Sequence, residues 1–138
     1  MKHEFIQKVY YADTDAYGVV WHGSYLRWME KGRVDLCEDL GLDLTELVKG
    51  NIALPVTNMN VKFKASARLN EKILVETWIE KLSPLTVTFG QTIKNAETKN
   101  LYIQAQFEVV AITNDGKLYR RLPEQLKLAF EGALLCND

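Results

Sequence analysis

The longest helical pattern in this chain lies near its beginning, over residues 24–40, and it limits the folds that the rest can adopt. Most charged residues of this segment fall on one side, and Gly41 follows where a left-handed C-cap favours glycine. Gly32 costs about 1 kcal/mol relative to alanine inside a helix, which indicates close contact with a strand. A deeply buried amphipathic helix is therefore predicted. Its apolar face consists of Tyr25, Trp28, Met29, Gly32, Leu36, Cys37 and Leu40.

Period-two alternation of apolar and polar residues predicts strands in much of the remaining chain. The connections between the later runs are short, so neighbouring strands should pair antiparallel. Pro55 lies near the start of the second run, where a missing amide hydrogen costs least. Strands are expected at residues 5–11, 52–63, 72–81, 85–94, 101–113 and 118–121.

Two further helices complete the predicted order of elements. A capping box at residues 43–46 opens a short helix that ends near Gly50, and Pro123 precedes a C-terminal helical pattern. One buried helix and an antiparallel sheet with a single apolar face satisfy each other if the sheet wraps around the helix. The predicted fold class is α+β, with one domain over residues 1–138. A cone-shaped α+β fold of small-ligand carriers is the alternative, although it usually places its helices in a different order.

Composition narrows the possible partners. The formal net charge of −1 offers no broad basic field for nucleic acid or an anionic membrane. No apolar run approaches the roughly 20 residues of a membrane span, and the N-terminus lacks a signal-peptide core, so a cytoplasmic protein is expected. Cys37 and Cys136 are too few for a disulfide framework. His3 and His22 are far apart and neither neighbours a cysteine pair, so we expect no metal and no cofactor.

Reactive side chains concentrate in residues 10–25, between the first predicted strand and the long helix. Asp13 and Asp15 fall in a predicted turn, and His22 and Gly23 fall at the predicted helix start. Free N–H groups in the first turn of a helix stabilise an oxyanion, and one such donor lowers a barrier by about 3–4 kcal/mol. A carboxylate opposite them can attack a carbonyl or take a proton from water. Asp15 is the candidate for that carboxylate.

Ordinary structural roles explain the same residues equally well. Aspartates bond their own backbone in turns, so Asp13 and Asp15 could both be turn formers. A single histidine before a helix is more often a cap or a packed ring than a base. On the residues alone, both interpretations of Asp15 and His22 therefore stay open.

The pattern Asp13-x-Asp15-x-x-Gly18-Val19-Val20-x-His22-x-x-Tyr25, followed by a helix with Trp28, Glu30 and Arg33, resembles the 4-hydroxybenzoyl-CoA thioesterase family of hotdog-fold proteins. It is most similar to the acyl-CoA thioesterases associated with the bacterial Tol–Pal system, and the resemblance extends over nearly the whole chain. It implies a hotdog fold, an antiparallel sheet wrapped around a long central helix. It also implies that Asp15 is the catalytic carboxylate and that His22 is the family's histidine.

The resemblance further implies where substrate would bind. The helix N-terminus that polarises the thioester carbonyl falls near Gly23 and Ser24, and we expect Tyr25 beside them. The strand over residues 52–63 passes beside the bound thioester, so Thr57 and Asn58 are expected contacts. Some relatives carry basic residues where this chain has the turn Leu82-Ser83-Pro84, and Tyr17 replaces a small residue. These departures leave the CoA phosphate contacts and the acyl group open.

A thioester suits this set of residues, because its thiol leaving group, with a pKa of about 8.5, departs without a strong general acid. No Gly-x-Ser-x-Gly elbow is present, and Cys37 falls on the buried face. We therefore predict an acyl-CoA thioesterase that releases a small aliphatic or aromatic acid and CoA. A non-catalytic acyl- or lipid-binding module is the alternative, and a hotdog dehydratase is a weaker one. The resemblance also implies a homodimer or homotetramer.

Overall fold

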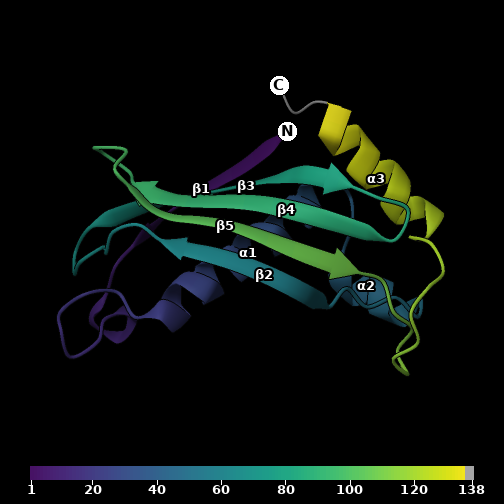
Figure 1. Ribbon diagram of the computed structural model, residues 1–138, viewed down its shortest axis with the longest axis horizontal. Coiled ribbons are helices and arrows are strands. Elements are labelled where there is room, and N and C mark those ends of the chain that lie inside the picture. Colours follow the sequence, from purple (N-terminus) through teal and green to yellow (C-terminus); the bar gives the residue numbers. More distant parts are fainter. Residues whose placement is uncertain (136–138) are drawn as a thin grey trace.

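A computed structural model describes residues 1–135, and Cys136 lies outside the described residues. The strands form one antiparallel sheet in the order β1-β3-β4-β5-β2. Figure 1 shows α1 running along one face of this sheet, with α3 near the end of β3. The elements are β1 (Lys2–Lys8), a 3₁₀ turn η1 (Tyr11–Asp13), α1 (His22–Asp39), α2 (Leu44–Lys49), β2 (Val56–Phe63), β3 (Lys72–Leu82), β4 (Thr86–Asn95), β5 (Leu101–Val110) and α3 (Glu124–Leu135).

The inner face of the sheet packs on α1 where Gly32 removes a side chain. A Cβ atom on Gly32 would lie 2.4 Å from Thr77 Oγ1 and 3.0 Å from Gln91 Nε2. The predicted close contact between the middle of the helix and a strand is therefore confirmed. On the far side of this core, the ring of Phe130 in α3 meets Phe89 edge-on, with centroids 6.0 Å apart.

Four predicted strands differ from the observed ones, and the one expected at residues 101–113 ends at Val110. β1 covers Lys2–Lys8, not residues 5–11, because the chain turns into η1, where Asp13 Oδ2 accepts from Tyr10 N at 2.9 Å. Residues 52–55 contribute only the isolated bridge of Ala53 to Ile112, since the register slips next to Pro55. The expected strand at 118–121 is reduced to one bridge from Leu118 to Ile112, whose other side is already paired with Ala53.

The two free edges of the sheet differ in chemistry. β1 exposes the charged side chains of Lys2, Glu4 and Lys8 with the apolar Ile6 among them, and charge on an edge strand is a common protection against pairing with another chain. β2 instead exposes apolar side chains on its α1-facing side: Val56 is 42%, Met59 55% and Phe63 48% exposed. Since α1 covers these side chains only in part, with Phe63 against His22, the β2 edge is left as an apolar border of the inner face.

Candidate active site

A tight hairpin over residues 14–20 brings Asp15 next to the start of α1. Thr14 pairs with Val20, Asp15 N donates to Val19 O at 2.9 Å, and Gly18 has a φ of +77° that suits glycine. The half-buried Asp15 carboxylate accepts at Oδ1 from Tyr17 N at 2.8 Å and from Val19 N at 3.4 Å. Within the described residues, Oδ2 accepts no hydrogen bond. One carboxylate oxygen orders the turn, and the other is left for a further partner.

The start of α1 is not capped by a side chain. Trp21 occupies the N-cap position without a side-chain hydrogen bond, so the amides of the first turn can serve another acceptor. Two bonds to Asp13 O hold this end in place, from Trp21 N at 2.8 Å and from Ser24 Oγ at 3.1 Å. A Cβ on Gly23 would lie only 2.1 Å from the Trp21 ring, so a side chain there would displace this exposed ring. The start of α1 is therefore fixed in position, and it has no side-chain acceptor for its first backbone amides.

The predicted site residues of the first helical turn have different surroundings. His22 is exposed, and its ring lies against Phe63 of β2 with centroids 4.7 Å apart. The buried hydroxyl of Tyr25 accepts from Ala67 N at 2.9 Å, and burial raises the pKa of this phenol. Ser24 and Tyr25 use their side chains within the fold, and Ser24 N also donates to Trp21 O at 3.0 Å, so the amides that precede Ser24 are the ones left for a substrate.

Thr57 and Asn58 lie at the opposite end of β2 from His22. Phe63 marks the His22 end, and the intervening residues of an extended strand span about 20 Å. The Thr57 hydroxyl donates to Glu108 O at 3.3 Å, and Asn58 pairs with Glu108 in the ladder. A single chain therefore does not bring these two predicted contacts together with Asp15.

A cavity of about 320 Å³ opens between α1 and the start of β2. Its walls are mostly apolar, and its charged side chains are Glu30 and Arg33. Arg33 Nη1 donates to Gln91 Oε1 at 3.0 Å, and the guanidinium lies 4.0 Å from the centroid of the Phe107 ring. Burial lowers the pKa of Arg33 to about 10, against the opposing charge of Glu30, so the side chain stays cationic at neutral pH. The residues are Glu30, Arg33, Val34, Cys37, Leu44, Leu54, Val56, Phe89 and Val109.

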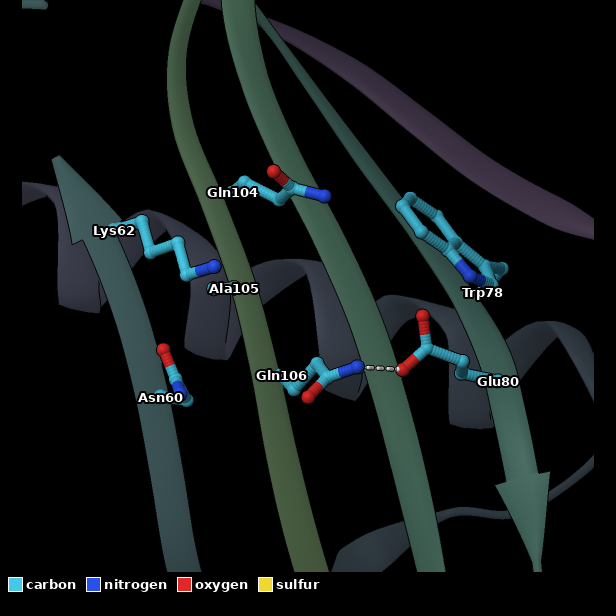
Figure 2. A pocket seen from close by; sticks show the side chains of 7 residues that line it. All are labelled: Asn60, Lys62, Trp78, Glu80, Gln104, Ala105 and Gln106. Carbon is cyan, nitrogen blue, oxygen red and sulfur yellow. Dashed lines mark hydrogen bonds between the residues drawn. The ribbon is translucent and has the colours of Figure 1, made fainter. Parts of the chain in front are cut away.

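A shallower cleft of about 120 Å³ lies on the opposite, outer face of the sheet. Figure 2 shows its amide and charged side chains, with Gln106 donating to Glu80 and with α1 behind the strands. Trp78 closes one side because Gly90 opposite it has no side chain. None of the predicted catalytic residues lies among these lining residues, which are Asn60, Lys62, Trp78, Glu80, Gln104, Ala105 and Gln106.

Other kinds of site find little support in the described part of the chain. Burial raises the pKa of the Cys37 thiol to about 12, so the thiolate that a nucleophile requires is disfavoured. Across residues 1–135, no three His, Cys, Asp or Glu side chains gather closely enough to hold a metal ion. No helix within the same range is long and apolar enough to cross a membrane.

Comparison with known protein families shows which family this chain belongs to. Residues 9–130 match the family model of the thioesterase-like superfamily. The chain belongs to that superfamily. It is 32% identical over 124 residues to the acyl-CoA thioester hydrolase YbgC of Escherichia coli O157:H7, covering 90% of this chain and 92% of the relative. The family resemblance predicted from the motif around Asp15 is thus confirmed, as is membership of a family of thioester hydrolases.

Solved structures confirm the fold of this superfamily member. The DHNA-CoA thioesterase from Staphylococcus aureus superposes with a TM-score of 0.89 at 31% identity, covering 99% of this chain and 93% of that one. A 4-hydroxybenzoyl CoA thioesterase shares the fold at a TM-score of 0.81 and 20% identity, covering 93% and 98%. The predicted hotdog architecture, an antiparallel sheet around a long helix, is therefore confirmed.

Proposed function

We propose that this chain hydrolyses the thioester of a small aliphatic or aromatic acyl-CoA to the free acid and CoA. The observation that carries the proposal is the Asp15 carboxylate, held through Oδ1 with Oδ2 unengaged, on a hairpin that runs directly into the uncapped start of α1. Its similarity to an acyl-CoA thioester hydrolase and to a DHNA-CoA thioesterase supports the same reaction. A cytoplasmic location is part of the proposal.

In the proposed mechanism, the thioester oxygen binds at the first turn of α1. The amides near Gly23 and the helix dipole stabilise negative charge as it develops on that oxygen. In one route, Asp15 attacks the carbonyl carbon, CoA leaves as a thiolate, and water then hydrolyses the mixed anhydride to free acid and Asp15. In the other, Asp15 removes a proton from the water that attacks the carbonyl carbon, and CoA leaves as a thiolate. His22, exposed beside Phe63, orients the substrate at the mouth of this site.

The proposed active unit is a homodimer formed through the β2 edges. Antiparallel pairing of two β2 strands would cover Val56, Met59 and Phe63, which are exposed in the single chain. It would also bring the Thr57 end of one strand toward the Phe63 end of the other. The expected contacts from Thr57 and Asn58 would then reach the Asp15 site of the second copy, and a homotetramer made of two such dimers is compatible with the same pairing.

Release of free thiol from aliphatic and aromatic acyl-CoAs tests the proposed reaction, with Asp15→Asn as the decisive variant. Asparagine keeps an Oδ1 acceptor for Tyr17 N and Val19 N and removes only the charge. We expect kcat/KM to fall by about 100-fold or more for every substrate that the wild type hydrolyses. Asp43→Asn is the matched control, because Asp43 Oδ1 also bonds two backbone amides, at the start of α2. Unchanged turnover in Asp15→Asn would exclude Asp15 as the catalytic carboxylate.

One observation favours the alternative of a non-catalytic acyl-binding module. The bonds of Asp15 Oδ1 to Tyr17 N and Val19 N are those of an ordinary turn former. In that case the purified protein would bind acyl-CoA without releasing thiol, and Asp15→Asn would bind equally well. A dehydratase is disfavoured because His22 and Glu30 are separated by about 12 Å along α1.

A further inference from the structure

Arg33 is the one cation among the residues that line the cavity between α1 and β2. Its place is set by a fully buried amide: Gln91 Nε2 donates to Met29 O and to Thr77 Oγ1, both at 2.8 Å. These two bonds fix the orientation of the Gln91 side chain, so its Oε1 faces Arg33. The guanidinium is therefore held in a defined position by the sheet behind it.

Within the described part of the chain, no carboxylate forms an ion pair with this guanidinium. Among residues 1–135, no Asp or Glu oxygen lies within 4.0 Å of a nitrogen of Arg33. Gln91 and the Phe107 ring satisfy only part of its fork of N–H donors. Because a cation withdrawn from water is stabilised most by an anion with matching geometry, the cavity lacks its natural counter-ion.

We propose that this cavity receives the far end of the acyl group and that Arg33 selects a carboxylate there. The inference rests on the proposed thioesterase function and adds a substrate class, the CoA thioesters of dicarboxylic acids. The apolar walls, Leu54, Val56 and Val109 among them, suit the methylene chain between the two acyl ends. A guanidinium binds a carboxylate through two parallel hydrogen bonds, which an alkyl end cannot accept.

Because the cavity lies at the start of β2, the acyl group of a thioester bound at the start of α1 can extend into it. Val56 lines the cavity, and Phe63 at the other end of the same strand contacts His22. In the proposed dimer, antiparallel β2 strands bring the cavity of one copy toward the His22 of the other. Within one chain, Arg33 stands about 16 Å along α1 from His22, a distance that favours the arrangement between two copies for a short diacid.

Glu30 borders the same cavity, and its charge raises the pKa of the half-buried Arg33, but no oxygen of Glu30 lies within ion-pair distance of the guanidinium. Because Glu30 is exposed, water screens its charge. A hydroxyl at the end of the acyl group could donate to Glu30, whereas a carboxylate binds Arg33 alone. Recognition by Glu30 would therefore favour hydroxyaryl substrates, whereas recognition by Arg33 would favour carboxyalkyl substrates.

Thiol release from matched substrate pairs tests the inference: adipyl-CoA against hexanoyl-CoA, and 4-hydroxybenzoyl-CoA against both. We expect the wild type to favour adipyl-CoA in kcat/KM by about 10- to 100-fold, the range of one charge-assisted pair of hydrogen bonds. Arg33→Met should abolish this preference, measured as the ratio of the two kcat/KM values, and Arg33→Lys should restore part of it. Arg27→Met, which removes an exposed cation from the same helix, should leave the preference intact.

Binding separates this inference from the proposed reaction. Non-hydrolysable thioether analogues of adipyl-CoA and hexanoyl-CoA, titrated calorimetrically, report the carboxylate preference even if no thioester is cleaved. Hydrolysis of hexanoyl-CoA as fast as adipyl-CoA, or equal binding of the two thioethers, would overturn the role of Arg33 and leave the proposed reaction intact. A preference for 4-hydroxybenzoyl-CoA that is lost in Glu30→Gln would also overturn the role of Arg33. So would a monomeric Arg33→Met protein, because the guanidinium would then belong to the contact between subunits.

Discussion

At Asp15, turn formation and the proposed catalysis do not compete, because they use different oxygens of one carboxylate. Oδ1 accepts from Tyr17 N and Val19 N, and Oδ2 has no bond within the described residues. Glu76 is a contrasting carboxylate on the outer face of the sheet, where both oxygens are engaged. Its Oε1 lies 2.8 Å from Lys94 Nζ and accepts from Thr92 Oγ1 at 2.7 Å, and its Oε2 lies 3.3 Å from Lys2 Nζ. These contacts make Glu76 a stabilising residue.

The free energy of unfolding should therefore depend on pH through Glu76. Burial alone would raise the pKa of this carboxyl, but the bonds from Lys94, Thr92 and Lys2 outweigh it and lower the pKa to about 2. Since the folded-state pKa lies below the unfolded one, the stabilisation is complete above about pH 4.5 and is lost as pH falls toward 2. We expect Glu76→Gln to cost about 2 kcal/mol in urea unfolding at pH 7 and almost nothing near pH 2.

Glu4 provides the control for this measurement. It pairs with Glu76 in the ladder between β1 and β3 but is exposed. Glu4→Gln should change the free energy of unfolding by less than about 0.5 kcal/mol at either pH. A cost of Glu76→Gln that did not shrink on acidification would contradict the assigned role of these ionic bonds.

At the scale of elements, α1 and the sheet meet through small and polar groups as well as through apolar packing. Gly32 lets the helix backbone approach β3, and Gln91 bridges the two layers by bonding Met29 O and Thr77 Oγ1. The alternation in residues 85–94 carried a signal for this bridge, since Gln91 interrupts an otherwise apolar face. The alternation alone assigns no role to Gln91, because a polar residue facing inward is explained only by the partner that it meets.

Gly32→Ala tests the close approach of these elements. In an exposed helix the change would stabilise by about 1 kcal/mol, but here the new Cβ meets Thr77 Oγ1 at 2.4 Å. Because the obstacle is a fully buried side chain on a strand, we expect a net loss of about 1–3 kcal/mol in chemical denaturation. Gly132→Ala in α3, where a Cβ would meet nothing within 4 Å, should instead be neutral or stabilising. Equal effects at the two glycines would contradict the packing argument.

At the scale of the whole molecule, the unequal edges of the sheet determine how a second copy can bind. Lys64 N donates to Tyr102 O at 2.8 Å, and amide directions alternate along a strand, so the N–H of Met59 points to the free edge of β2. On β1, Val9 N donates to Glu71 O at 2.9 Å, so by the same alternation the N–H of Ile6 points to the free edge. Met59 and Ile6 are thus equivalent positions on opposite edges.

Proline substitution at these two positions should separate folding from pairing. Met59→Pro removes a hydrogen-bond donor and an apolar contact from the β2 edge without touching the ladder to β5, so the chain should fold as a monomer with thiol release reduced at least 10-fold. Ile6→Pro makes the same change at the β1 edge and should leave both mass and activity unchanged. Light scattering with thiol release checks both, and a dimeric, active Met59→Pro protein would exclude pairing through β2.

The sequence by itself determined the α+β class, the long buried helix, the alternating strands and the motif around Asp15 and His22. These features depend on local periodicity and on turn chemistry, which short stretches of sequence carry. The ends of β1 and β2 were less certain, because strand ends depend on which partners remain unpaired. β1 accordingly ends at Lys8, where the chain enters the turn of η1.

Only the tertiary structure decided which distant residues meet. It separated Thr57 and Asn58 from His22 by the length of β2, and it held Arg33 against Gln91 and Phe107 in a cavity. Strand order places β2 beside β5 at an edge, although β3 follows it in the chain. Such contacts depend on the closure of the whole sheet around α1, so no local pattern encodes them.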